Sequence, residues 1–202
     1  MSLDSPVFPV FLKLGGRKAV VVGGGSMATS KLAALLRSGA DVTVVSPRFS
    51  EEIEASGVTL LRRGFESEDL EGAWYAVAAA TPEVNRRVAV AAEERRIFVN
   101  AVDDPANASA YLGGVLRRGD LTIAISTEGQ APAVAGLLRE ALEELLPKEI
   151  ATWLDEAQRQ KRLWREERVP MISRRPLMLA ALNRLYKARG ESPSEELPPE
   201  GA

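Results

Sequence analysis

Residues 19–28, Ala-Val-Val-Val-Gly-Gly-Gly-Ser-Met-Ala, decide the fold of this chain. An apolar run that ends directly in three glycines is typical of a strand buried on both faces and followed by a tight turn. Residues 27–38 then carry apolar side chains at roughly helical spacing, and Gly39 stands where a helix C-terminal cap is expected. The stretch therefore predicts a strand, a glycine loop and a helix in succession.

The same alternation continues along the chain. Further strands are predicted at residues 42–45, 58–61, 74–80, 97–99 and 121–125, and further helices at 83–96, 133–146, 149–168 and 171–188. Strands that alternate with helices imply parallel pairing with right-handed crossovers, which is a Rossmann-type α/β fold. The character changes at Lys148, where a charged helical region begins, and residues 191–202, rich in Glu, Pro and Ser, are expected to be a disordered tail.

Composition excludes several kinds of chemistry. The 202 residues include no cysteine, so disulfides, thiolate metal sites and cysteine nucleophiles are excluded. They also include no histidine, which excludes a histidine base, a Ser-His-Asp triad and a His-ligated metal site. The net charge of −2 does not predict binding to nucleic acid or to anionic membranes. Without a visible signal peptide or an apolar run of about 18 residues, we expect a cytoplasmic protein.

The glycine loop reads Gly23-x-Gly25-x-x-Ala28. In a dinucleotide-binding loop the first glycine permits a tight turn, the second lets the backbone approach the pyrophosphate, and the third small residue lets helix and strand pack closely. Free N–H groups at the helix N-terminus attract the phosphates. The alternative is a strand-to-helix turn without a ligand, and the order of strand, loop, helix and second strand favours the dinucleotide site.

The end of the second predicted strand departs from the common NAD pattern. An acidic residue that binds the ribose hydroxyls is expected there, but the sequence has Ser46, Pro47 and Arg48. From this feature alone, Arg48 either accommodates the 2′-phosphate of NADP or is a solvated surface residue, and both interpretations stay open.

Two more polar segments follow strands. Residues 100–105, Asn-Ala-Val-Asp-Asp-Pro, lie beyond a strand's carboxyl end, where ligands bind in open α/β sheets. An aspartate there can accept a proton as hydride leaves for a nicotinamide, although Asp and Pro are also common turn residues. Residues 126–132, Ser-Thr-Glu-Gly-Gln-Ala-Pro, offer hydroxyl and N–H groups for substrate carboxylates, and the alternative is helix capping by Thr127.

Together these motifs resemble the siroheme synthase N-terminal family, whose members are precorrin-2 dehydrogenases and in some cases also sirohydrochlorin ferrochelatases. The resemblance covers residues 9 to about 147 in order. It rests on Pro9-Val10-Phe11-Leu12, residues 21–28 with Lys31, Val44-Val45-Ser46-Pro47, Ala79-Ala80-Thr81, Val84-Asn85, Asn100-Ala101-Val102-Asp103 and residues 121–127.

The resemblance implies a homodimer with three parts: an NAD-binding Rossmann domain at 1–112, a dimerisation region at 113–148 and a helical domain at 149–190. It implies NAD as the oxidant, in preference to NADP, and Asp103 as the acid–base residue. It implies precorrin-2, a polycarboxylate tetrapyrrole, as substrate and sirohydrochlorin as product. The predicted cofactor-binding residues are Gly23, Gly25, Ser26, Met27, Ala28, Ser46, Pro47, Arg48 and Thr81.

For the substrate we predict contacts from Ser126, Thr127, Arg117 and Arg118, because guanidinium groups bind carboxylates in pairs of hydrogen bonds. The alternative for the two arginines is a solvated turn before Gly119. Ferrochelatase activity, with ferrous iron as co-substrate and no metal site of the protein's own, is left open.

Two departures from the family concern the substrate more than the cofactor. The family often has an aromatic residue followed by Pro-Ala or Pro-Ser, whereas residues 111–114 of this chain are Tyr-Leu-Gly-Gly. In addition, Glu128 stands where a glycine is usual. A carboxylate beside a polycarboxylate substrate is repulsive unless it points away. Two other functions stay open: an NAD-sensing regulatory module without turnover, and an NADP-dependent reductase of another small molecule.

Overall fold

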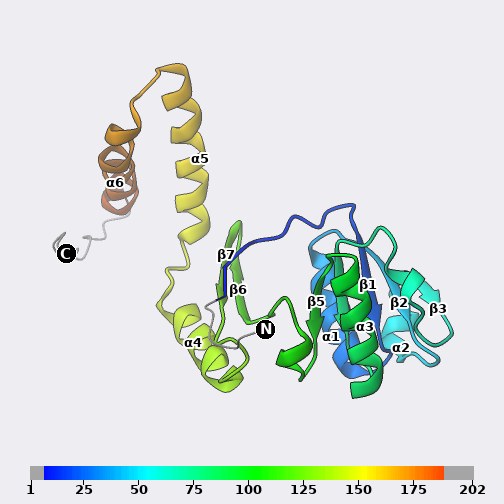
Figure 1. Ribbon diagram of the computed structural model, residues 1–202. Helices are drawn as coiled ribbons and strands as arrows, with labels where there is room; N and C mark the ends of the chain where they lie inside the picture. Colours follow the sequence, from blue (N-terminus) through cyan, green and yellow to red (C-terminus); the bar gives the residue numbers. More distant parts are fainter. Residues whose placement is uncertain (1–6, 189–202) are drawn as a thin grey trace. The chain divides into compact units, whose positions relative to one another are not determined.

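The computed structural model describes residues 7–188, so the predicted tail at 191–202 lies outside the described residues (Figure 1). The chain divides into two compact units, each described here by itself. The first unit runs up to Gly113 and also includes Ser126–Val134, whereas the second comprises Gly114–Ile125 and the chain from Ala135 onward.

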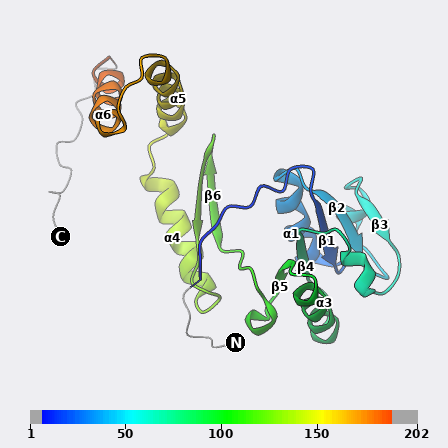
Figure 2. The ribbon, with the colours of Figure 1, turned by 45° about the horizontal axis from the view of Figure 1, so that its top comes forward.

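The first unit contains a five-stranded parallel sheet with the order β3-β2-β1-β4-β5 (Figure 2). Its strands are β1 (Lys18–Val22), β2 (Asp41–Val45), β3 (Thr59–Leu61), β4 (Tyr75–Ala78) and β5 (Phe98–Ala101). The predicted Rossmann-type fold is confirmed. The direction in which strands are added reverses between β1 and β4, so the carboxyl ends of these two strands form the switch point at which such sheets bind ligands.

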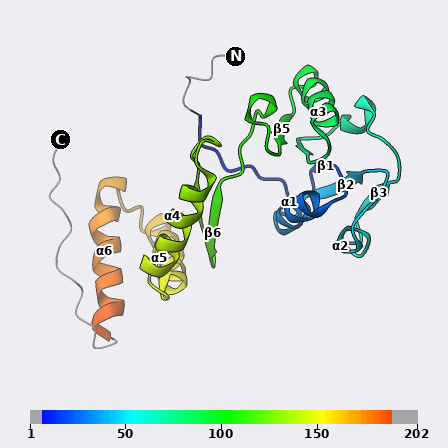
Figure 3. The same ribbon diagram turned by 90° about the horizontal axis from the view of Figure 1, so that it is seen from below.

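Helices cover both faces of this sheet (Figure 3). Successive residues of β1 point to opposite faces, so Val20 and Val22 join one hydrophobic cluster and Ala19 and Val21 join the other. The first cluster lies under α3 (Pro82–Glu94) and the 3-10 helix η1 (Ser67–Leu70), and the second lies under α1 (Ser26–Arg37) and α2 (Glu51–Glu54). Burial on both faces explains why β1 and β4 are uninterrupted apolar runs.

Most predicted elements are present with ends shifted by one or two residues. The predicted strand at 74–80 is shorter, Tyr75–Ala78, and the helix expected at 27–38 is α1. Gly39 adopts a φ of +74° and donates its N–H to the Leu36 carbonyl, as expected for a C-terminal cap. The short helix α2 was not predicted, because four residues are too few to show helical periodicity.

The second unit begins with an antiparallel hairpin of β6 (Gly114–Arg118) and β7 (Leu121–Ile125). Only β7 was predicted, and the arginines expected just before a turn are the last residues of β6. Helix α4 (Pro132–Leu145) packs closely on β6 from Ala135 onward: a β-carbon on Gly114 would lie 2.9 Å from the Ala135 carbonyl oxygen.

Two longer helices complete this unit, α5 (Ile150–Glu166) and α6 (Met171–Ala188). They are in contact, and the apolar side chains of Trp164 in α5 and Ala181 in α6 are buried. Among the helices of residues 7–188, none is long and apolar enough to cross a membrane.

Asp69, in η1, is a buried carboxylate on which the loop between β3 and β4 depends. Arg63 donates two hydrogen bonds to it, and the Glu66 N–H donates a third at 2.9 Å. Burial alone would raise the pKa of Asp69, but these hydrogen bonds and the Arg63 charge outweigh it and hold the pKa below its ordinary value.

We therefore predict that Asp69→Asn lowers the free energy of unfolding by about 2 kcal/mol at pH 7. Because the folded-state pKa is lowered, this stabilisation is present above about pH 4, the pKa of an unfolded aspartate, and is lost as the pH falls through the folded-state value. Urea unfolding at pH 7 and at pH 3 checks both statements, with exposed Glu68→Gln as the control. An equal loss at both pH values would contradict the role of the charge.

Candidate dinucleotide and substrate site

The first two of three successive glycines let the ends of β1, β2 and β4 approach one another. Gly23 has a φ of +129°, and a β-carbon there would lie 2.2 Å from the Ala79 carbonyl oxygen. A β-carbon on Gly24 would lie 1.8 Å from the Arg48 carbonyl oxygen. Around Gly25, in contrast, a β-carbon would have no atom within 4 Å. The first two glycines are thus needed for packing, and the third leaves the loop backbone open.

The open glycine lies directly before α1. Gly25 is the N-cap residue of this helix and has an extended backbone, and no side chain caps the first turn. The first-turn N–H groups are therefore without a side-chain cap, and uncapped N–H groups with the helix dipole attract a phosphate. Ser26 and Met27 are exposed in this turn, whereas Ala28 is fully buried, which lets α1 pack closely on the sheet. These residues fit the pyrophosphate of a dinucleotide.

The loop after β2 is held against the glycine loop. The Ser50 N–H donates to the Gly24 carbonyl at 2.7 Å, and the Ser50 hydroxyl lies 2.9 Å from that of Thr29. Ser46 is buried and accepts a hydrogen bond from the Arg48 N–H at 3.4 Å. Pro47 and the Arg48 side chain are exposed beside this loop.

Ser50 was not identified from the sequence, although a signal for it exists. It caps α2 by accepting from the Ile53 N–H and is followed by Glu51 and Glu52, which is a helix-start pattern.

The end of β4 is fixed by a buried amide. The Asn85 side-chain oxygen accepts from the Ala80 N–H at 2.8 Å, which holds the turn that leads into α3. Thr81, predicted to bind the cofactor, is exposed and is the N-cap residue of α3, accepting from the Val84 N–H at 3.5 Å. Asn85 was recognised only as part of a family motif, and no role was predicted for it.

The two aspartates after β5 have different surroundings. Asp104 directly precedes the short helix η2 (Pro105–Asn107), and its carboxylate accepts from the Asn107 amide at 2.7 Å. Asp103 is exposed, and its backbone has a φ of +56°, in the left-handed region that non-glycine residues rarely adopt. The preceding Val102 N–H donates to the Ala78 carbonyl at 2.9 Å, which places Asp103 at the carboxyl edge next to β4.

The turn at residues 126–131 lies against the Asp103 turn. A β-carbon on Gly129 would lie 3.3 Å from the Pro105 ring and 3.9 Å from the Tyr111 ring, and the Tyr111 hydroxyl donates to the Pro105 carbonyl. The structure thus brings together the second and third polar segments found in the sequence.

Both predicted hydroxyls of this turn accept backbone hydrogen bonds. Ser126 accepts from the Glu128 N–H at 3.1 Å, and Thr127 accepts from the Ala131 N–H at 3.3 Å, a bond within the turn that precedes α4. Each hydroxyl still has a hydrogen to donate. These turn hydrogen bonds and substrate binding are therefore compatible.

Glu128 also has a positive φ, +54°, which explains in physical terms why glycine suits this position. Its carboxylate accepts from the backbone N–H of Val7 at 3.4 Å. The extra negative charge is thus engaged by the N-terminal segment.

Arg117 and Arg118 belong to the second unit and differ from each other. Arg118 donates hydrogen bonds to the carbonyls of Glu143, Leu146 and Pro147, so it caps the C-terminal end of α4. Arg117 is exposed and donates to the Thr122 hydroxyl at 3.2 Å. We therefore retain Arg117, rather than Arg118, as the candidate for binding carboxylates.

The fold and the open glycine loop define an NAD(P)-binding Rossmann protein. An NAD(P)-binding family model, NAD_binding_7, matches residues 10–114, and the model of the sirohaem biosynthesis protein central domain matches residues 118–145. The chain belongs to the siroheme synthase N-terminal family, as the sequence motifs predicted. A nicotinamide cofactor follows from this membership.

Similar proteins and a similar solved structure support the same family. The chain is 41% identical over 147 residues to the siroheme synthase of Citrobacter koseri and 40% identical over the same length to that of Salmonella typhi. Each match covers 70% of this chain and 32% of the relative, so the matched region is about one third of these proteins. Among solved structures, SirC, a precorrin-2 dehydrogenase, is similar with 26% identity and a TM-score of 0.69, covering 90% of this chain and 92% of SirC.

The glycine loop yields a paired prediction. Gly25→Ala introduces a methyl group into open space, so we expect unchanged thermal stability and at least tenfold weaker NAD binding, because the methyl group blocks the approach of the pyrophosphate. Gly24→Ala clashes with the Arg48 carbonyl, so we expect a lower melting temperature together with lost binding. Thermal unfolding and calorimetric titration with NAD check both variants. Equal NAD affinity in Gly25→Ala and the parent would contradict the assigned cradle.

Proposed function

We propose that this chain catalyses the NAD-dependent dehydrogenation of precorrin-2 to sirohydrochlorin in siroheme (or cobalamin) biosynthesis, with Asp103 as the acid–base residue. The observation that carries the proposal is the position of Asp103 at the carboxyl edge, beside the 126–131 turn. Similarity to SirC along nearly the whole chain supports the choice of substrate.

The proposed cofactor is NAD. Gly25, Ser26 and Met27 would hold the pyrophosphate, and Ser46, Pro47 and Arg48 would lie along the adenosine half, with Thr81 at the end of β4. Bound NAD supplies the hydride acceptor. The preference for NAD over NADP rests on the family resemblance, since Arg48 by itself is compatible with either.

Asp103 would remove the proton. Dehydrogenation takes two hydrogens from the substrate, one as hydride to the nicotinamide and one as a proton to the Asp103 carboxylate, which passes it to water. Asp104 is the poorer candidate because its carboxylate is engaged by Asn107. Ser126 and Thr127 would donate hydroxyl hydrogens to substrate carboxylates, and Arg117 would pair with another.

We also propose that the chain forms a cytoplasmic homodimer through residues 113–148. This region exposes apolar side chains, among them Val115 at 43%, Leu137 at 65% and Leu145 at 77% of their full accessibility. Such a surface favours burial against a second copy. Ferrochelatase activity stays a prediction, with ferrous iron as a substrate.

The test of the proposed function is anaerobic NADH formation from NAD and enzymatically generated precorrin-2. We expect absorbance at the NADH band to rise together with sirohydrochlorin, and NADP to support the reaction less well. NAD binding without turnover would overturn the proposal in favour of a sensing module, and a preference for NADP would favour the reductase alternative. Adding ferrous iron to the product tests the chelatase.

Asp103→Asn is expected to lower the turnover number by roughly 10²–10⁴-fold, the loss typical of an acid–base residue, while NAD binding is unchanged. Asparagine tolerates the left-handed backbone, so the turn is retained. The matched control is Asp104→Asn, for which we expect at most a small loss of turnover. Equal turnover in Asp103→Asn and the parent would refute the assignment.

A further inference from the structure

Three exposed cations form a stripe on α5. Lys161 and Arg165 are four residues apart and Arg162 and Arg165 are three apart, so all three lie on neighbouring positions of one helix face. We call Lys161, Arg162 and Arg165 the basic stripe. Trp164, three residues after Lys161, lies beside the stripe and is buried.

Several other arginines of the second unit have partners. Arg159 is paired with Glu156, and Arg118 and Arg174 donate to backbone carbonyls. Within residues 7–188, no hydrogen bond or ion pair involves the side chains of the stripe, even though Glu166 lies four residues after Arg162. Like charges at this spacing repel and destabilise a helix, and a bound polyanion would relieve that repulsion.

The charge of this region is opposite to that of the whole chain. Residues 149–188 contain nine basic and five acidic residues, a net charge of +4, whereas the whole chain has a net charge of −2. Residues 189–202 add one basic and four acidic residues, so the excess of basic charge is confined to 149–188, where the cations attract a polyanion.

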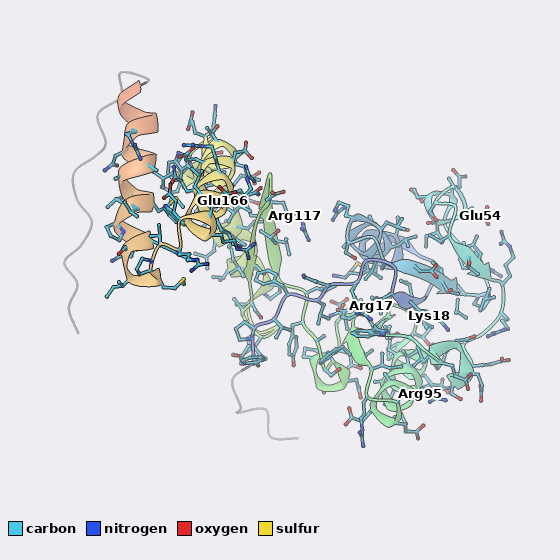
Figure 4. All side chains as sticks on the ribbon, turned by 90° about the horizontal axis from the view of Figure 1, so that it is seen from above. Arg17, Lys18, Glu54, Arg95, Arg117 and Glu166 are labelled. Atoms are coloured by element: carbon cyan, nitrogen blue, oxygen red, sulfur yellow. The ribbon has the colours of Figure 1, made fainter. Side chains whose placement is uncertain are left out.

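The hairpin reaches the same face of α5. The Gln158 amide donates to the Asp120 carboxylate at 3.0 Å, and a β-carbon on Gly119 would lie 3.4 Å from the Ala151 methyl group. Gln158 is one helical turn before the stripe, so the hairpin tip contacts the face that continues into the stripe. Arg117, exposed on β6, therefore belongs to the same unit as the stripe (Figure 4).

We propose that the basic stripe binds the carboxylates of the tetrapyrrole substrate, as a docking surface that captures the polycarboxylate from solution. This inference rests on the proposed function for the identity of the substrate. Two guanidinium groups and one ammonium group match several carboxylates on one planar ligand, and each guanidinium can hold a carboxylate with two hydrogen bonds. A polyanionic ligand is steered to such a surface, and steering weakens as salt rises.

The kinetic test uses the triple variant Lys161→Gln, Arg162→Gln and Arg165→Gln in the full chain. We expect the KM for precorrin-2 to rise about tenfold, as expected for three exposed ion pairs, with kcat and the KM for NAD unchanged. The control removes the same formal charge from exposed positions elsewhere, Lys13→Gln, Arg37→Gln and Lys148→Gln, and is expected to keep the parent's KM. High salt should bring the parent's KM towards that of the triple variant, and an unchanged KM in the triple variant would overturn the proposal.

A binding measurement separates failure of this inference from failure of the proposed function. Uroporphyrin, a redox-inert polycarboxylate porphyrin, serves as the probe, and coproporphyrin carries half as many carboxylates. We expect the triple variant to bind uroporphyrin about tenfold more weakly than the parent or the control, with a smaller effect on coproporphyrin. If the parent forms no NADH but the triple variant still binds uroporphyrin more weakly, the proposed dehydrogenase activity is contradicted and the proposed docking surface stands. Equal uroporphyrin affinity in the triple variant, or no binding by the parent, would overturn the docking surface.

Discussion

The close approach of the chain to Gly23 and Gly24 is the constraint on which the site depends. Carbonyl oxygens of the β4 and β2 loops occupy the places where β-carbons would otherwise stand, so any side chain at either glycine would force the strand ends apart. That convergence lets the Ser50 N–H reach the Gly24 carbonyl. The first turn of α1 has no side-chain cap because its N-cap residue is Gly25, so its backbone N–H groups can attract a phosphate.

A second constraint separates the two aspartates that follow β5. From their positions in the sequence, Asp103 and Asp104 are equally good candidates for the acid–base residue. Their hydrogen bonds distinguish them. Asp104 takes part in the η2 turn through Asn107, whereas Asp103 is left exposed in a left-handed backbone conformation. Such conformations cost of order 1 kcal/mol and persist when surrounding contacts enforce them. Here the Val102 N–H bond to β4 and the packing of Gly129 on Pro105 supply those contacts.

The sequence predicted what depends on local pattern. Gly23, Gly25 and Ala28 followed from spacing, and the parallel sheet followed from alternating strands and helices. Strand β6 was missed because Leu116 is its single buried residue and two arginines follow it, so neither alternation nor an apolar run is present. Gly24 was missed because its role depends on the Arg48 carbonyl, a contact between distant residues that no local motif encodes. The capping role of Arg118 likewise depends on where α4 ends in space.

Electrostatics link the remaining features. A net-acidic chain that is to bind a polycarboxylate must keep its own carboxylates away from the ligand and concentrate its cations where the ligand arrives. Glu128 occupies a position beside the Asp103 turn where the family usually has glycine, and its carboxylate is engaged by the Val7 N–H. Unpaired cations, meanwhile, gather on α5, at the cost of mutual repulsion. The first arrangement gives the Glu128 carboxylate a hydrogen-bond partner within its own unit, and the second adds an attraction for such a substrate.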